Sequence, residues 1–332
     1  AGASVTYVSA LISRQILQLA SADGLWRAQI SPVGASLVSL WHGDIEIITS
    51  PYNEPLRALA GSVMAPWPNR LEDGTWQLGD REFKATINDA EGHNANHGLA
   101  FDKEFALASQ TDSRLHLELN LFDEQAYPFS VLLSVTYLLQ NTGLQVELEA
   151  KNLSNEDVPV AFGMHPYFVL DQDSTLSVDA KTWITKNARN LPLSASQFEH
   201  SPLAKNAGQD ICNLELDECF TDLRFGSNDF CVTTVTRPSL GIAVEVEQGD
   251  IALGRAVEFQ DLGDLEAALE FGPDVGAQAV AEGQLQLVLG LVLIVRGGGQ
   301  VTAQFADIDE HGGAGRLDVG PEIGRRELLA DD

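Results

Sequence analysis

The sequence predicts an all-β protein built mainly from antiparallel strands. Between about residues 16 and 246, short stretches of alternating apolar and polar residues are separated by clusters of Gly, Asn, Asp and Pro. This pattern is typical of half-buried strands joined by turns. No helical segments alternate with these stretches, so we expect a sandwich or a barrel-like stack rather than a parallel α/β sheet. The length of 332 residues allows one large β domain or two smaller ones.

Four stretches are the clearest strand candidates. Residues 26–30, 115–121, 131–139 and 144–150 are rich in β-branched or aliphatic side chains, with polar residues at alternate positions. Residues 141–143, Asn-Thr-Gly, lie between the last two stretches and predict a hairpin turn. We therefore expect an antiparallel pair at this point of the chain.

The composition of the chain changes abruptly at residue 251. From there to residue 332 the sequence has no Lys, Asn, Ser, Cys, Met, Trp or Tyr, and Gly, Ala, Leu, Val, Asp and Glu dominate. We interpret residues 1–250 as the β body and residues 251–305 as final strands that are either divergent or translated out of frame. Residues 306–332, which are acidic and glycine-rich, are expected to form a flexible tail.

Charge and cysteine content limit the partners and the setting. The formal net charge is −28, which would repel nucleic acid and anionic lipid surfaces and favours solubility. Three cysteines without CxxC spacing form no disulfide framework, so we expect a reducing, cytoplasmic location. Because no export signal is visible and the longest apolar run, residues 287–295, is too short to cross a bilayer, we expect no membrane insertion. The sequence leaves open the oligomeric state and whether Ala1 is the true N-terminus.

Residues 64–71, Met-Ala-Pro-Trp-Pro-Asn-Arg-Leu, form a conformationally restricted segment with two prolines. Trp67 offers an apolar face for a sugar ring, and Arg70 offers five donors for hydroxyl oxygens. The alternative is that Trp67 packs in the core and Arg70 forms a surface ion pair.

Two histidines lie in a glycine- and asparagine-rich stretch, at His93 and His97. A zinc site would need further ligands, and only His165 is available, without an acid or thiol at a recognisable spacing. We therefore expect no metal, and interpret His97 as a donor to a substrate hydroxyl, with Gly98 allowing close approach of the backbone.

The strongest local signal is at residues 161–168, Ala-Phe-Gly-Met-His-Pro-Tyr-Phe. Here His165 lies between apolar and aromatic neighbours. A partly buried imidazole that titrates near neutrality could donate a proton to a substrate oxygen. The alternative is a structural histidine with its hydrogen bonds satisfied inside the core.

Together these segments resemble the aldose 1-epimerase (galactose mutarotase-like) family over about residues 30–246. The resemblance rests on motifs in the family's order: the opening strand and turn at 30–37, the PWPNR segment with Asp73-Gly74, Asn96-His97-Gly98, Tyr127-Pro128-Phe129 leading into 135–137, Asn152 before Val158-Pro159, and the GxHPYF string at 163–168. It implies a large antiparallel β-sandwich of the supersandwich type that binds a sugar without a cofactor.

The resemblance also implies roles for individual residues. Arg70 and His97 would bind sugar hydroxyls, Asp217 would hold further hydroxyls, and His165 would be the general acid at the ring oxygen. The family's catalytic base is a glutamate on a late strand, for which Glu270 is the first candidate and Glu258 the second. Neither is followed by the residues that the family's pattern would have.

These features favour an enzyme, an aldose 1-epimerase that interconverts the anomers of a free hexose. Three alternatives stay open: a carbohydrate-binding protein of the same fold without catalysis, a hexose-6-phosphate epimerase, and an inactive product of a damaged reading frame. The preferred sugar depends on hydroxyl contacts and is not predicted by the sequence.

Overall fold

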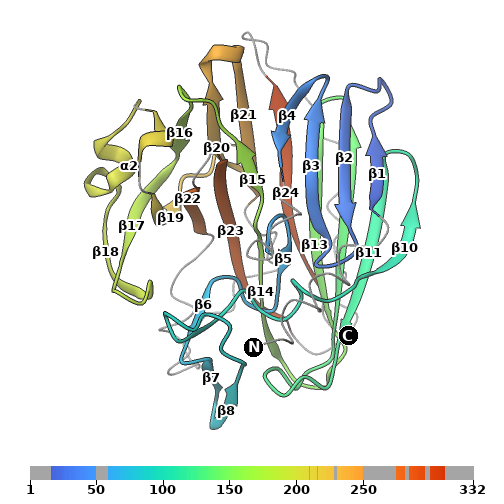
Figure 1. Cartoon of the computed structure of the whole chain (residues 1–332). Helices are drawn as coiled ribbons and strands as arrows, with labels where there is room; N and C mark the ends of the chain where they lie inside the picture. The colour runs from blue at the N-terminus through green and yellow to red at the C-terminus, as the bar shows by residue number, and fades with distance from the viewer. Residues whose placement is uncertain are drawn as a thin grey trace, which may run out of the picture.

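The computed structural model describes residues 16–49, 59–208, 210–214, 216–227, 230–249, 274–280, 284–295 and 300–310. Within these residues two large antiparallel sheets pack face to face, which confirms the predicted β-sandwich (Figure 1). Glu258 and Glu270 lie outside the described residues.

The first sheet has twelve strands. Ten follow the order β1-β2-β3-β4-β15-β23-β22-β19-β17-β18, while β14 pairs with both β23 and β5. Their bounds are β1 Leu17–Ala20, β2 Trp26–Ser31, β3 Ser36–His42, β4 Ile45–Ile48, β5 Val63–Met64, β14 Val158–Met164, β15 Tyr167–Val169, β17 Ala180–Lys186, β18 Pro192–Gln197, β19 Asp217–Leu223, β22 Asp274–Val280 and β23 Gln284–Val295.

The second sheet has eight strands in the order β10-β11-β12-β13-β24-β21-β20-β16. Their bounds are β10 Ala106–Gln110, β11 Arg114–Leu121, β12 Val131–Gln140, β13 Gly143–Asn152, β16 Thr175–Val178, β20 Phe230–Arg237, β21 Ile242–Gly249 and β24 Gln300–Glu310.

Two small sheets and a few helical turns complete the described structure. The small sheets pair β6 with β9 and β7 with β8, with bounds β6 Arg70–Glu72, β7 Thr75–Leu78, β8 Arg81–Lys84 and β9 Asn94–Asn96. The helical turns are η2 Phe198–His200, α2 Pro202–Lys205, η3 Ile211–Asn213 and η4 Pro238–Leu240. No helix among the described residues is long and apolar enough to span a membrane.

The four predicted strands are confirmed, as β2, β11, β12 and β13. In β2 and β13, residues that face the core alternate with more exposed ones, as the apolar pattern predicts. The predicted hairpin is also present, because β12 and β13 pair antiparallel down to Gln140 and Gly143.

A continuous core fills the space between the sheets. Leu117, Leu133 and Leu148, on neighbouring strands of the second sheet, are each at most 1% exposed. The hydroxyl of Tyr137 in β12 donates to the carbonyl of Ala35, 2.6 Å away, in the turn before β3. This bond ties the two sheets together across the core and satisfies a hydroxyl that would otherwise be buried without a partner.

The last described strands are integral to both sheets. β23 lies between β15 and β22 in the first sheet, and β24 lies between β13 and β21 in the second, as their labels in Figure 1 show. β24 extends past residue 305, the predicted limit of the final strands, to Glu310. Residues 306–310, which were expected to belong to a flexible tail, are therefore part of a strand, and residues 311–332 lie outside the described residues.

Truncation of a core leucine should test how tightly the sheets pack. Leu117→Ala is expected to lower the free energy of unfolding by about 2–5 kcal/mol, because it removes buried methyl groups and leaves a cavity. Leu107, its register partner in β10, is 50% exposed. The control Leu107→Ala should therefore change the free energy by about 0.5 kcal/mol or less. Denaturant unfolding measures both, and equal losses would contradict this packing.

Candidate functional site

Two of the singled-out segments are brought together by a short strand pair. Met64 in β5 is the antiparallel register partner of Gly163 in β14, so the residues after Met64 run beside those before Gly163, and His165 lies beside Ser62. The amide of Gly61 donates to the carbonyl of His165 at 2.7 Å, and the amide of His165 donates to the carbonyl of Ser62 at 3.2 Å. The proline-rich segment and the histidine after β14 are thus fixed to each other through the backbone.

The segment that contains His97 is connected to the proline-rich segment by the small β6–β9 sheet, in which Arg70 pairs with Asn96. The amide of His97 donates to the carbonyl of Asn69 at 2.8 Å. Gly98 then forms a bridge with Ala65, whose carbonyl also accepts the amide of Leu99 at 2.7 Å. Gly98 has φ +75°, and a Cβ there would lie 2.2 Å from the Ala65 oxygen, so only glycine fits.

His97 and His165 meet as a result. Their rings lie edge to face, with centroids 5.2 Å apart and an interplanar angle of 85°. The centroid of the Tyr167 ring lies 5.5 Å from that of His165. His97 is 7% exposed and His165 is 3% exposed, so both imidazoles are largely removed from water.

Arg70 provides the positive charge of this cluster. Its Nη1 donates to the side-chain oxygen of Asn69 at 3.0 Å. Its Nε is buried and has no hydrogen-bond partner among the described residues. An arginine has five N–H donors, so donors remain for a bound molecule that carries oxygen atoms.

Burial and the charge of Arg70 keep both histidines neutral. Burial first, and the charge of Arg70 to a smaller extent, lower the pKa of His165 from its usual 6.5 to about 4, against the opposing effect of a backbone hydrogen bond. Burial, His165 and Arg70 hold the pKa of His97 well below its usual range. The expectation that His165 is partly buried and titrates near neutrality is therefore wrong, because the sandwich covers the ring almost completely.

The hydrogen bonds of His97 indicate its tautomer. Its Nδ1 lies 3.2 Å from the amide nitrogen of Asn69, which donates to it. Neutral His97 therefore carries its proton on Nε2. Nε2 can then donate to an oxygen of a bound molecule, which is the function expected of this residue.

Trp67 lies in the loop between β5 and β6 and is half-buried. Its indole N–H points to the carbonyl of Ala95 at 3.4 Å. This contact fixes the edge of the ring against β9. The use of its face as a sugar platform stays a prediction.

Asp217 lies apart from the histidines. The register leads from Asp217 to Gln278, Gln286 and then Tyr167, which is three strand spacings of about 4.8 Å each across one sheet. The Asp217 carboxylate forms an ion pair with Lys186 at the end of β17. Asp217 and Tyr167 are in one row and on one face of the sheet, but the expected hydroxyl ligand is held by a lysine that the sequence analysis did not identify.

His93 is not part of the cluster. Its side chain is exposed, and its Nδ1 lies 2.9 Å from a carboxylate oxygen of Asp73. Within the described part of the chain, no three or more His, Cys, Asp or Glu side chains are grouped in a way that could hold a metal ion.

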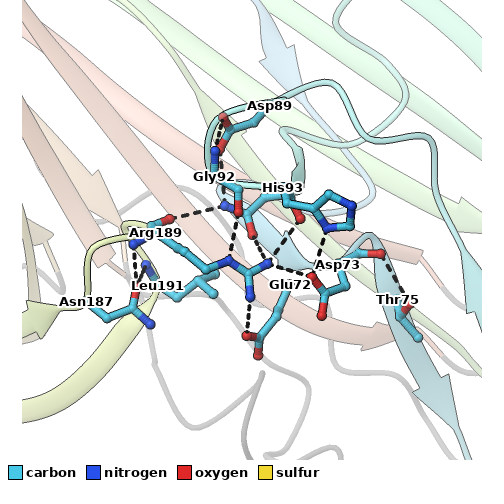
Figure 2. A network of polar contacts seen from close by, with 10 residues as sticks. Glu72, Asp73, Thr75, Asp89, Gly92, His93, Asn187, Arg189 and Leu191 are labelled. Carbon is cyan, nitrogen blue, oxygen red and sulfur yellow. Dashed lines mark hydrogen bonds and ion pairs between the residues drawn. The ribbon is translucent and has the colours of Figure 1, made fainter.

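Sequence reasoning also missed the polar network around Arg189 (Figure 2). This arginine, in the turn between β17 and β18, forms ion pairs with Glu72 and Asp73, next to the strand that starts with Arg70. Nothing in the local sequence marks it, because its partners lie more than a hundred residues earlier in the chain.

Comparison with known proteins gives one family and several solved folds. The family model described as aldose 1-epimerase matches residues 17–251, which ends where the composition changes. The uncharacterized protein YihR of Escherichia coli K12 is 27% identical over 241 residues, covering 70% of this chain and 76% of that protein.

Two solved structures are similar in fold. A galactose mutarotase-like protein from Clostridium acetobutylicum has a TM-score of 0.70 at 16% identity, covering 87% of this chain and 92% of the other. Galactose 1-epimerase from Lactobacillus acidophilus has a TM-score of 0.64 at 15% identity, covering 90% of this chain and 99% of the other.

Substitution of Gly98 should separate the three segments. Gly98→Ala combines a left-handed φ with overlap on Ala65, so the free energy of unfolding should fall by about 2–5 kcal/mol. Gly79 has a similar φ of +58° but open space around it. The control Gly79→Ala should therefore cost only about 1–2 kcal/mol. Chemical denaturation of both variants checks this, and equal losses would contradict the close contact at Gly98.

Acid should destabilise the protein through the buried histidines. The native pKa of His165 is about 4 against 6.5 in the unfolded chain, so between these values the unfolded state binds more protons. The stability present above pH 6.5 is thus lost as the pH falls, by up to about 1.4 kcal/mol per pH unit for this residue. His165→Gln should reduce the slope of unfolding free energy against pH. Equal slopes in the wild type and in His165→Gln would contradict the prediction.

Proposed function

The chain belongs to the aldose 1-epimerase family, and on that premise we propose that it interconverts the α and β anomers of a free hexose. The observation that carries the proposal is the convergence of three segments on one cluster. His97 and His165 are in ring contact, and the charge of Arg70 acts on both of them. Donors grouped in this way suit a ligand that presents several oxygen atoms on one ring.

Anomer exchange requires two coordinated proton transfers. A base removes the proton of the anomeric hydroxyl, the C1–O5 bond breaks as C1 becomes the aldehyde carbon, and an acid delivers a proton to O5. After rotation about the C1–C2 bond, O5 attacks the opposite face of the carbonyl and both protons return. No net oxidation or group transfer takes place, so the chain's own side chains can supply the acid and the base.

His165 is the proposed acid. With a pKa lowered to about 4, its imidazolium is a strong proton donor but a minor species at neutral pH in the free protein. A carboxylate near the ring would stabilise the charged form and raise this pKa. The proposed base, Glu270 or in second place Glu258, would thus both accept the anomeric proton and favour protonation of His165.

The remaining groups are proposed to bind hydroxyls. Arg70 has unused donors, and His97 carries its proton on Nε2, facing away from the Asn69 amide. Trp67 would lie against the apolar face of the ring. Asp217 would reach a hydroxyl on the far side of the sugar if its ion pair with Lys186 leaves one oxygen available.

A phosphorylated hexose is less well supported than a free one. A phosphate needs cationic side chains that are available to hold it. Among the cationic side chains described above, Arg70 has unused donors, whereas Lys186 is paired with Asp217 and Arg189 with Glu72 and Asp73, so a phosphate would have a single available cation besides the sugar ligands it would displace. Comparing glucose with glucose 6-phosphate as substrates separates the two possibilities.

The proposal is tested by the rate at which freshly dissolved α-glucose and α-galactose reach equilibrium, followed by polarimetry. The wild-type protein should accelerate at least one of them beyond buffer alone. His165→Gln should reduce the catalysed rate by about 10²–10⁴-fold, because it removes the proton donor. His116, half-buried in β11 and hydrogen-bonded to Thr136, provides the matched control, and His116→Gln should keep the wild-type rate.

Two outcomes would contradict the proposal. Well-folded wild-type protein with a rate equal to buffer for every hexose tested would exclude mutarotation. If calorimetry then detected hexose binding, the chain would be a carbohydrate-binding protein of this family. A normal rate for His165→Gln would exclude His165 as the acid.

A further inference from the structure

The turn between β17 and β18 is built to hold one arginine in place. The side-chain oxygen of Asn187 accepts the amides of Arg189, at 2.8 Å, and Leu191, at 3.2 Å. The amide of Asn187 in turn donates to the carbonyl of Leu191 at 2.9 Å. The side-chain bonds mimic backbone turn hydrogen bonds and fix the direction in which Arg189 leaves the hairpin (Figure 2).

The guanidinium of Arg189 contacts the β6–β9 unit, which we define as strands β6 and β9 with the residues that adjoin them, Asp73, Gly92 and His93. Its Nε donates to the carbonyl of Gly92 at 2.8 Å, Nη1 to Glu72 at 2.8 Å and Nη2 to Asp73 at 2.7 Å. Nη2 also lies 3.2 Å from the carbonyl of His93. Figure 2 shows these contacts converging from both arms of the β6–β9 unit on the single side chain.

The opposite end of that unit carries the proposed sugar ligands. Glu72 and Asn94 are the cross-strand pair nearest to Arg189, and the side-chain amide of Asn94 donates to the Arg189 carbonyl at 3.1 Å. Arg70 and Asn96 form the pair at the other end, and His97 follows directly. The distance from one end to the other is two residues, about 7 Å of extended chain.

The β6–β9 unit needs such an anchor. It belongs to neither of the large sheets, and a pair of three-residue strands is not stable by itself. Hydrogen bonds from His93 and Arg189 hold the pKa of Asp73 below its usual range, which is the sign that these contacts stabilise its charged form.

The same hairpin also reaches Asp217. Lys186, the last residue of β17, contacts both the carboxylate and the backbone carbonyl of Asp217, the latter at 2.6 Å. Lys186 and Arg189 therefore connect one rigid turn to two groups of proposed sugar ligands that lie apart in the sheet.

We infer that Arg189 is a positioning residue that sets the spacing between Arg70 and His97 on one side and Asp217 on the other. The use of this spacing for a hexose rests on the proposed function. The claim that Arg189 holds the β6–β9 unit in place does not rest on the proposed function.

The ion pairs of Arg189 do little for global stability. The side chains are 33% exposed for Arg189, 63% for Glu72 and 56% for Asp73, and ion pairs this exposed contribute little to the free energy of unfolding. The ion pairs instead fix the geometry of the β6–β9 unit. The planar guanidinium of Arg189 donates at the same time to Glu72 and Asp73, at the end of β6, and to the carbonyl of Gly92, before β9. Arg189→Lys keeps the charge and loses the planar guanidinium, which makes it the informative substitution.

The first test is amide hydrogen exchange of residues 92–98 in wild type, Arg189→Gln and Arg189→Lys, without ligand. Both variants should exchange faster in this segment, Arg189→Gln by about tenfold or more, while the core strands β12 and β13 keep wild-type protection. Arg224→Gln is the matched control, because Arg224 pairs with Asp179 at the opposite end of the β17–β19 strand pair. It should leave residues 92–98 unchanged. Wild-type exchange of this segment in Arg189→Gln would overturn the inference.

The second test separates positioning from chemistry. Groups that bind hydroxyls act equally on bound substrate and transition state, so Arg189→Gln should raise KM for hexose about tenfold with little change in kcat. Arg189→Lys should recover part of this loss, and Arg224→Gln should behave as wild type. A fall in kcat at unchanged KM would overturn the positioning role. If wild-type protein has no mutarotase activity, the proposed function fails, and the exchange measurement still decides how Arg189 acts.

Discussion

The structure around the histidines depends on two carbonyl groups of one short segment. The Ala65 carbonyl accepts the amides of Leu99 and Ala100, and the Pro66 carbonyl accepts the amide of Ala161 at 2.7 Å. These bonds connect a loop, a turn and a central strand that are far apart in sequence. Buried carbonyls must find donors, so this arrangement is as firmly specified as a ladder of the large sheets. The contact between His97 and His165 follows from it.

The same burial controls the electrostatics of the cluster. Two imidazoles lie beside a guanidinium in a volume largely closed to water, and both are pushed towards the neutral state. The unused donors of Arg70 favour oxygen-rich ligands, and its charge also acts on the carboxylate of Asp89. A neutral sugar is compatible with this site because its hydroxyls can accept from Arg70 and His97 simultaneously.

The strands were predictable because each half-buried strand displays its own alternation of apolar and polar residues. The order of strands in the sheets was not, since pairing between residues such as Glu149 and Thr302 depends on partners far away in the chain. For the same reason the sequence pointed to Arg70, His97 and His165 but gave no sign of Lys186 or Arg189. The resemblance supplied Asp217, but its separation from Tyr167 needed the register. The low pKa of His165 also escaped prediction, because burial depends on which segments cover a ring.

The positions of β23 and β24 have a consequence for how the chain folds during synthesis. Both lie in the interior of their sheets, between strands made much earlier, such as β15 for β23 and β13 for β24. Until residues 284–310 have left the ribosome, the first sheet consists of three unjoined parts and the second of two, each with open edges. Open edges pair readily with other chains, and long-range pairings form slowly. During synthesis the chain therefore passes through a stage in which most of its strands have been made but the parts of neither sheet are yet joined.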